Sequence, residues 1–557
     1  MALQTLTIRL KNTATEHRVP VGYNLEQVYE LLSLSLPHGA TSAKVNNKVE
    51  GLHYTLFSDK DIEFLDTSSP SGLRTYTRSL FFVLYKATND LFPQSRLRIE
   101  ISMSGGFYCR LLKQGEESTT EQDVADLRRR MQEIIDADLP FRRITAHTDE
   151  AAALFRQYGQ EDKALLLESQ GKLYTHYYTL DGLPDYFYGS LLVRTSQIYL
   201  FDLIAYGEGL LLRIPDSASP DTLRTIFPQE KLFDIFRENH RWQDILGIST
   251  IGQLSDACKK GFASTLIHVS EALQEKKIAA LADRIAARPE IRVILIAGPS
   301  SSGKTTFSKR LSVGLAVCGL RPVPISLDDY FVDRDKTPLD SEGQYDFEHL
   351  HALNIPLFNE QMRTLLQGGE VELPHYNFHS GKSEKSGKRL RLRENELLIL
   401  EGIHALNPEL TSNLPPESKF RIYASALTSI LLDYHNYIPT TDNRLLRRIV
   451  RDNKYRGYSA LDTIRRWPSV RRGEDRWIFP FQEEADEMVN TALLFELAAL
   501  RGEALPLLEA VPENQPEYSE AYRLRKFLTY LPPIDLRGLP PTSLLREFLG
   551  GSSFKYS

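Results

Sequence analysis

Alternating apolar and polar positions dominate the first 66 residues. Thr5–Leu10 alternates as a half-buried strand does, and shorter runs at 43–45 and 61–65 are also typical of strands. Between the first two, Asn24 precedes apolar residues spaced along one helical face from 25 to 32, so we predict a helix capped by Asn24. A strand, a helix and further strands in so short a length predict a ubiquitin-like β-grasp module.

The pattern from about residue 73 to 230 alternates between helical and strand periods, which predicts an α+β unit. The stretch from Asp66 to Gly72 has the composition of a linker. We predict helices at 76–91, 121–138 and 150–158, and strands at 97–102, 106–111, 198–204 and 209–214. A later helix at 266–287 is stopped by Pro289.

From Arg292 onward the apolar runs no longer alternate. Val293–Ala297 is continuously apolar, as expected of a strand buried on both faces, and similar runs recur at 323–327 and 397–400 with helical segments between them. This predicts an α/β unit with a parallel sheet. The last residues, with two Leu-Pro-Pro repeats, have the composition of an appended tail.

Composition narrows the function classes. The 557 residues carry 67 Lys and Arg against 73 Asp and Glu, a net charge of −6, which argues against broad nucleic-acid binding but permits a local patch. Three separated cysteines cannot form a disulfide framework, and no apolar stretch is long enough to cross a membrane. We therefore expect a soluble, cytoplasmic protein without a membrane partner.

The strongest chemical signal is Gly-Pro-Ser-Ser-Ser-Gly-Lys-Thr, which follows the buried strand and opens a helix. This is a phosphate-binding loop, in which glycines let backbone N–H groups turn toward phosphates and the helix N-terminus faces them. Lys304 is expected to reach the β- and γ-phosphates of a nucleotide, and the Thr305 hydroxyl to bind Mg²⁺. ATPases, GTPases and small-molecule kinases all share this loop, so other residues must decide between them. The predicted nucleotide-binding residues are Gly298, Pro299, Ser300, Ser301, Ser302, Gly303, Lys304, Thr305 and Thr306.

Carboxylates follow two further predicted strands. Asp328 and Asp329 end one, and Glu401 ends another. Ligands of open α/β sheets bind at the carboxyl ends of the strands, so an aspartate there can accept a proton from a substrate hydroxyl or hold magnesium. Glu401 fits a second magnesium partner. Capping of the following segment is the alternative role for each.

Arginines at 444, 447, 448 and 451 form one stripe of a predicted helix, with apolar residues opposite. Like charges on one face repel unless an anion meets them, so the stripe is a candidate for binding transferring phosphates. The alternative is a solvated charged face.

These motifs together resemble the uridine kinase/phosphoribulokinase family of P-loop kinases over about 292–500. The resemblance rests on GPSSSGKTT, SLDDYF, YDFEHLHALN, PHYNF, LEGIH and DNRLLRRIVRDNKYRG, in that order. It implies an ATP- and Mg²⁺-dependent kinase in which Asp328 is the general base and, with Thr305 and Glu401, a metal ligand. The resemblance also implies a homo-oligomer, but the large N-terminal fusion leaves the oligomeric state open.

The remaining roles also follow from this resemblance. Asp346 or Glu348 would meet ribose hydroxyls, Tyr376 would lie against the base, and His379 is the candidate for reading it. Arg447 and Arg451 would act in catalysis, while Arg448 and Arg456 would complete a substrate-binding lid. The sequence departs from the family at Glu348, at Phe331 and around His379, which affects substrate specificity more than phosphoryl transfer.

Residues 77–87, then Gly105-Gly-Phe-Tyr, and later residues 141–158 follow one another along the N-terminal half. In that order they resemble the TGS and second additional domains of threonyl-tRNA synthetases. Arg78 and Phe82 stand where the editing histidines would be, so a binding or regulatory role is what the resemblance leaves. We therefore predict a TGS-like module at 1–66, a second-additional-domain-like unit at 67–230, a helical connector at 231–290, a kinase at 291–500 and a tail at 501–557. The predicted activity is phosphorylation of the 5′-hydroxyl of uridine or cytidine. The alternatives are another nucleoside or a sugar-like alcohol, and an RNA-associated nucleotide-dependent switch.

Overall fold

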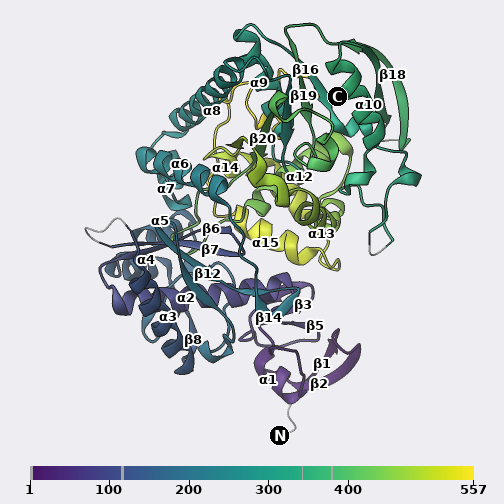
Figure 1. Cartoon of the computed structure of the whole chain (residues 1–557). Coiled ribbons are helices and arrows are strands. Elements are labelled where there is room, and N and C mark those ends of the chain that lie inside the picture. Colours follow the sequence, from purple (N-terminus) through teal and green to yellow (C-terminus); the bar gives the residue numbers. More distant parts are fainter. Residues whose placement is uncertain (1–3, 114–117, 341–342, 378–379, 557) are drawn as a thin grey trace.

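The computed structural model describes residues 4–113, 118–340, 343–377 and 380–556. The region with the phosphate-binding loop forms one end of the molecule, and the first sheet lies at the other (Figure 1). Across the described residues, no helix combines the length and apolar character needed to span a bilayer.

The N-terminal residues form a five-stranded sheet in the order β2-β1-β5-β3-β4. Strands β1 and β5 pair in parallel, and the other neighbours are antiparallel. The Asn24 side chain accepts a hydrogen bond from the Gln27 N–H, which confirms the predicted cap. The elements are β1 (Thr5–Leu10), β2 (Thr15–Pro20), α1 (Leu25–Leu31), β3 (Ser42–Val45), β4 (Lys48–Glu50) and β5 (Lys60–Leu65).

Two larger antiparallel sheets, a small two-stranded antiparallel sheet and a long buried helix, α2 (Pro70–Leu91), follow. The predicted linker is shorter than expected, because Ser69 caps α2 and starts it within that stretch. One sheet has the order β11-β12-β7-β6 and the other β10-β9-β8. The strand expected at 198–204 begins only at Asp202. The elements are β6 (Arg96–Met103), β7 (Gly106–Leu112), α3 (Glu121–Asp136), β8 (Phe141–His147), α4 (Thr148–Gln157), α5 (Glu161–Ser169), β9 (Tyr174–Leu180), β10 (Leu183–Asp185), β11 (Asp202–Tyr206), β12 (Gly209–Arg213), β13 (Pro215–Asp216) and β14 (Ser219–Leu223).

Three helices, α6 (Glu230–Leu246), α7 (Ile251–Lys259) and α8 (Ala263–Ala286), lead to a parallel sheet in the order β16-β19-β15-β20-β21. Both faces of this sheet are buried. Ile294 and Ile296 of β15 pack with α8 and α9, while Val293 and Leu295 pack with α10. Burial on both faces explains why the strands carry no alternation. The elements are β15 (Val293–Ala297), α9 (Lys304–Val317), β16 (Arg321–Ser326), α10 (Ile355–Leu366), β19 (Glu396–Glu401), β20 (Lys419–Ser425) and β21 (Glu487–Asn490), with the hairpin β17 (Glu370–Asn377) and β18 (Lys382–Arg391) and the short α11 (Pro408–Thr411) outside this sheet.

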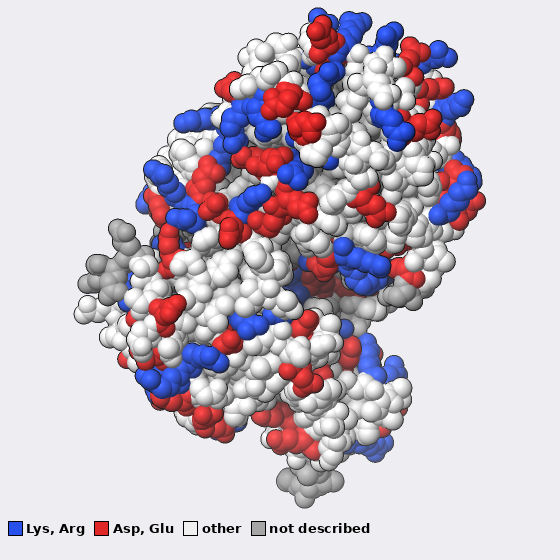
Figure 2. Space-filling view, in the orientation of Figure 1, with Lys and Arg blue, Asp and Glu red and all other residues white. Residues whose placement is uncertain are grey.

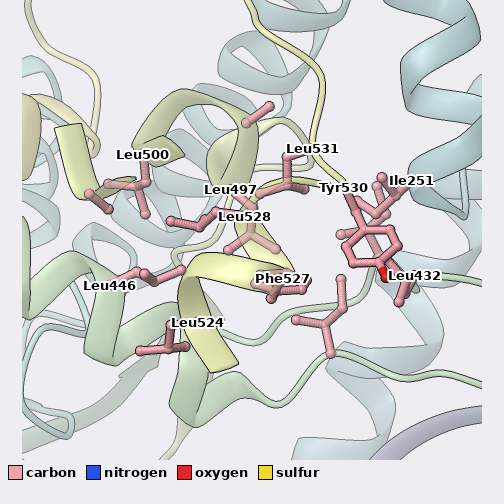
Figure 3. Close-up of a cluster of buried hydrophobic side chains, with 14 of the residues drawn as sticks. Ile251, Leu432, Leu446, Leu497, Leu500, Leu524, Phe527, Leu528, Tyr530 and Leu531 are labelled. Atoms are coloured by element: carbon pink, nitrogen blue, oxygen red, sulfur yellow. The ribbon is translucent and has the colours of Figure 1, made fainter. Parts of the chain in front are cut away.

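The residues after 500 are not an appended tail, which corrects the expectation from composition. Helices α14 (Glu496–Glu509), α15 (Tyr518–Leu528) and α16 (Arg546–Leu549) join α12 (Thr440–Arg456) and α13 (Ala460–Trp477) in a large core. Leu446, Leu497, Leu524 and Leu528 of this core lie together in Figure 3. The two Leu-Pro-Pro sequences lie between α15 and α16, and their leucines, Leu531 and Leu539, are part of this core.

A buried ion cluster joins the middle of the chain to the residues after β20. The Lys163 ammonium lies 2.9 Å from Asp185 and 2.7 Å from Asp433. His435 Nδ1 lies 2.8 Å from the other Asp185 oxygen. A buried charge is tolerated when opposite charges and hydrogen bonds surround it, so this cluster fixes the two parts against each other.

Candidate active site

The phosphate-binding loop runs from the end of β15 to the start of α9, at the carboxyl edge of the parallel sheet. Gly303 has φ 81° and Ser301 φ 59°, so the loop uses left-handed backbone on both sides of Ser302. A Cβ added at Gly298 would lie 2.1 Å from the carbonyl oxygen of Ala424 in β20. Only glycine fits there, which explains the first position of the motif.

Two loop serines offer hydroxyls to a ligand. Ser301 and Ser302 are 2% and 0% exposed, and their Oγ atoms have no hydrogen-bond partner among the described residues. Buried hydroxyls normally find a partner. A phosphate group in the loop would supply the acceptors, so the unsatisfied hydroxyls support nucleotide binding here.

Lys304 and Thr305 meet Glu401 at the end of β19. Lys304 Nζ lies 3.8 Å from Glu401 Oε1, and the Thr305 hydroxyl donates to the same oxygen at 3.2 Å. Burial raises the pKa of Glu401 to about 7; Lys304 opposes the rise and Asp328 reinforces it. The motif lysine and threonine therefore lie beside the strand-end glutamate.

The geometry around Thr305 and Glu401 suits a divalent cation. A hydroxyl and a carboxylate oxygen 3.2 Å apart are hard oxygen donors, and Asp328 lies within electrostatic reach of the carboxylate. Mg²⁺ is usually held by one or two such protein oxygens, with water and substrate phosphates completing its shell. The residues present fit that ion.

Asp328 lies in a short 3₁₀ turn directly after β16, and its side chain is exposed. Its neighbour Asp329 instead faces the β17–β18 hairpin, where its Oδ1 lies 3.0 Å from His375 Nδ1 and accepts from the Tyr376 N–H at 3.4 Å. Of the two adjacent aspartates, Asp329 holds the hairpin in place and Asp328 is left open to a substrate.

Glu348 lies in the same electrostatic cluster. Burial raises the pKa of this carboxyl to about 7; Arg448 and Lys304 oppose the rise, and Asp328 reinforces it. Its Oε2 atom is buried without a hydrogen-bond partner among the described residues. A Cβ on Gly473 of α13 would lie 2.2 Å from the Glu348 Cβ, so that glycine makes room for the carboxylate. The neighbouring Asp346 accepts from the Glu348 N–H at 3.1 Å, within the backbone turn.

The arginine stripe of α12 divides into two sets. Arg444 and Arg447 are fully buried and form ion pairs with Glu474 and Glu496. Arg444 donates to the Ser300 carbonyl at 3.1 Å, and Arg447 donates to the Ser301 carbonyl at 3.3 Å. The anions that balance this half of the stripe are therefore the protein's own carboxylates, and both arginines support the backbone of the phosphate-binding loop.

The second set stays closer to solvent and shares one aspartate. Arg448, Arg451 and Arg456 each donate to Asp452, at 3.1 to 3.3 Å. Arg448 also donates to the Ser300 hydroxyl at 2.8 Å. Repulsion from Arg451, with burial, lowers the pKa of Arg456 to about 10. Three guanidinium groups around one carboxylate leave an excess of positive charge beside the loop.

The predicted base-binding residues are placed differently from one another. Tyr376 is buried, and its ring packs 5.4 Å from that of Phe331. Phe331 in turn contacts Phe347, whose side chain is 40% exposed, at 6.4 Å. Phe347 also packs 6.1 Å from Tyr345, whose side chain is 43% exposed, so the row opens to solvent at these two rings. His379 lies outside the described residues.

Several functional neighbours carried no local signal in the sequence. Glu474 accepts from the Ser300 N–H at 3.1 Å, and Thr491 donates to the Ser302 carbonyl. The Thr306 hydroxyl donates to Glu547 of α16 at 2.6 Å. An arginine-rich helix beside a phosphate loop does signal that acids must balance it, but the fold alone determines which acids do so.

Comparison with known proteins agrees with this site. Residues 293–493 match the model of the phosphoribulokinase/uridine kinase family. A uridine kinase of Lactobacillus helveticus is 29% identical over 199 residues, 35% of this chain and 85% of that protein. One from Halobacterium salinarum is 27% identical over 196 residues, 35% of this chain and 77% of that protein. A Bacillus stearothermophilus structure titled a possible uridine kinase has a TM-score of 0.27 and 20% identity, covering 39% of this chain and 98% of its own. The family-model match and the uridine kinase relatives show that residues 293–493 form a phosphoribulokinase/uridine kinase family domain, and that the protein is an ATP-dependent kinase.

Proposed function

We propose that this kinase uses Mg²⁺ and transfers the γ-phosphoryl group of ATP to the 5′-hydroxyl of uridine or cytidine. The observation that carries the proposal is the grouping of Lys304, Asp328 and Glu348 at the carboxyl edge of the sheet. Lys304 and Asp328 both act on the pKa of Glu348, so the three charges lie near one another. Phosphoryl transfer to an alcohol requires a cation that binds the phosphate, a carboxylate open to the attacking hydroxyl and a group that accepts hydrogen bonds from the substrate. Lys304, Asp328 and Glu348 can supply these three in turn.

Each group has a distinct task in this mechanism. The exposed Asp328 carboxylate accepts the proton of the attacking hydroxyl. Glu348 Oε2, buried without a donor, accepts hydrogen bonds from the neighbouring hydroxyls of the substrate and so holds it in place. Lys304 and the loop N–H groups stabilise the negative charge on the transferring group. Mg²⁺, held by Thr305, Glu401 and Asp328, supplies further charge neutralisation when bound.

We assign the arginines to two roles. Arg444 and Arg447 are positioning residues, because both are buried in ion pairs and their hydrogen bonds to the loop go to its backbone carbonyls. Arg448, Arg451 and Arg456 provide the charge that meets the phosphates. The base lies against the exposed ring of Phe347 rather than against Tyr376, whose ring is buried.

The N-terminal half is proposed to be a TGS-like β-grasp unit at 1–66 followed by a second-additional-domain-like unit at 67–230. A five-stranded sheet with one parallel central pair supports the first assignment. Acidic and basic side chains are interspersed on the face drawn in Figure 2, so nothing on that face favours broad RNA binding.

The test is ADP release with ATP and Mg²⁺ across nucleosides, sugars and small alcohols, with the product identified by mass. We expect uridine or cytidine monophosphate from the wild type. Asp328→Asn should lower the turnover at least 100-fold, because a general base contributes about 10²–10⁴-fold, and should leave unchanged the ADP affinity measured without Mg²⁺. The matched control is Asp335→Asn, at an exposed aspartate nearby. Unchanged turnover in Asp328→Asn would contradict the base assignment. Phosphorylation of another alcohol alone would change the substrate, and ADP release that responds only to RNA would favour the switch.

A further inference from the structure

The last residues of the chain contact the phosphate-binding loop directly. Glu547 of α16 accepts two hydrogen bonds at one oxygen, Oε2, from the Thr306 N–H at 3.2 Å and the Thr306 hydroxyl at 2.6 Å. The Tyr556 hydroxyl lies 2.9 Å from the same Thr306 Oγ1. Thr306 is the third residue of α9, so its N–H is one of the free amides at that helix N-terminus.

Those amides are the groups that hold phosphates in such a loop. The loop amides and the first amides of the helix together cradle the phosphate chain, with the positive end of the helix behind them. A carboxylate oxygen at hydrogen-bond distance from the Thr306 N–H therefore occupies a position that a nucleotide phosphate would otherwise take. Glu547 stands there as an anion supplied by the protein itself.

The segment from 539 to 556, which we call the C-terminal strap, is anchored to the arginine helix as well. The Phe548 ring is fully buried and lies 4.9 Å from the Arg447 guanidinium. Lys454 of α12 donates to the Leu549 carbonyl at 2.6 Å. Directly after α16, Gly550 and Gly551 have φ values of 85° and 72°, in the positive range that glycine adopts without steric strain. The strap thus has side-chain anchors followed by a pair of glycines.

The charge of Glu547 also reaches the rest of the site. It reinforces the rise in the pKa of Glu401, the carboxylate that meets Lys304 and Thr305. With the strap in place, the loop faces several carboxylates. A phosphate entering beside Glu547 would meet a like charge at close range, so the two anions disfavour each other.

We propose that the C-terminal strap is an autoinhibitory element, in which Glu547 competes with a nucleotide phosphate for the N-terminus of α9. The proposal rests on the assignment of this loop as the ATP site. ATP binding then requires Glu547 to leave Thr306, and the apparent affinity falls by the fraction of molecules with the strap closed. A partner or ligand that holds the strap away would activate the kinase without touching the acceptor site.

Binding of ADP to the full chain, measured by calorimetry with Mg²⁺, tests the proposal. Glu547→Gln keeps the size and one acceptor but removes the charge, and we expect ADP to bind about tenfold tighter. Tyr556→Phe removes the second contact to Thr306, together with the hydrogen bond that the Tyr556 hydroxyl donates to Ser552 within the strap at 3.1 Å, and should tighten binding by a smaller factor. Glu509→Gln and Tyr158→Phe, at exposed positions away from the loop, are the matched controls and should bind ADP as the wild type does.

Hydrogen exchange gives a second readout that does not depend on catalysis. Saturating ADP should speed exchange of the amides in 546–550, because the nucleotide displaces the strap. Equal or weaker ADP binding by both strap variants, with exchange in 546–550 unchanged by ADP, would overturn the proposal. Tighter ADP binding without phosphorylation of any alcohol would support the strap and count against the proposed activity. Absence of ADP binding in every variant would overturn both.

Discussion

Removing one side of the Arg447–Glu496 pair separates the two roles an arginine can have beside a phosphate loop. Arg447 is 0% exposed and donates to Glu496 at 2.6 Å, to the Thr491 carbonyl at 3.1 Å and to the Ser301 carbonyl at 3.3 Å. Arg447→Met leaves the Glu496 carboxylate buried without its partner. Breaking a buried pair in this way costs about 3–5 kcal/mol of stability. Whole domains have only about 5–15 kcal/mol, so the loss should be large.

The informative variant is Glu496→Gln, which changes no group beside the transferring phosphate. If Arg447 is a positioning residue, Glu496→Gln should lower both the unfolding midpoint in urea and the affinity for ADP, the latter by about tenfold. The double variant Arg447→Met with Glu496→Leu should lose less stability than the sum of the single changes, because no buried charge is left alone. Tryptophan fluorescence suits the measurement, since Trp467 and Trp477 both lie on α13, next to α12.

A catalytic arginine would give the opposite result. An arginine that stabilises the transferring group contributes about 10³–10⁵ to turnover and little to folding. If Arg447→Met lowered turnover to that extent with unchanged urea midpoint, and Glu496→Gln behaved as wild type, the positioning argument would be refuted. Glu509→Gln, at an exposed carboxylate of the same helix α14 that carries Glu496, is the control for the loss of a negative charge.

Three further changes test other parts of the structure. Gly298→Ala should abolish ADP binding measured by calorimetry, because its Cβ would lie 2.1 Å from the Ala424 carbonyl oxygen; wild-type affinity would contradict the loop geometry. Lys163→Met should cost about 3–5 kcal/mol in urea unfolding, since it leaves two buried aspartates unbalanced, and a loss below 1 kcal/mol would contradict that reading. Burial lowers the pKa of Lys526 from 10.5 to about 8, so its charge destabilises the folded state below pH 8 and the penalty disappears as pH rises to 10.5. Lys526→Met should therefore gain up to about 3 kcal/mol relative to wild type at pH 7 but not at pH 10.5, and a pH-independent difference would refute the shift.

The sequence predicts the parallel sheet well because local pattern and tertiary burial agree there. Val293–Ala297 is continuously apolar, and both of its faces are covered in the structure. The helix expected at 266–287 is α8, shifted by a few residues. Asn24 caps its helix as expected, since capping depends on neighbours in the chain. Where the determinant is local, the pattern is sufficient.

The residues after 500 show the opposite case. Their prolines indicated an appended tail, yet Leu524, Leu528 and Phe548 are fully buried. Nothing within that segment reveals which surface it covers, because its apolar positions are satisfied only by helices from earlier in the chain. Composition describes a segment's own chemistry, whereas burial depends on what the rest of the fold leaves open.

The candidate site combines both cases. Lys304, Thr305 and Glu401 meet because each stands at the carboxyl edge of one parallel sheet, so their motifs predict the meeting. The arginine stripe correctly indicated that anions must lie beside this helix, but it did not indicate whether a ligand or the protein's own carboxylates supply them. Buried Glu474 and Glu496 balance Arg444 and Arg447. Of the other two arginines of the stripe, Arg448 donates to a loop hydroxyl and Arg451 pairs with Asp452. The ion pairs that a charged helical face forms within the protein should therefore be identified before its remaining charges are assigned to a ligand.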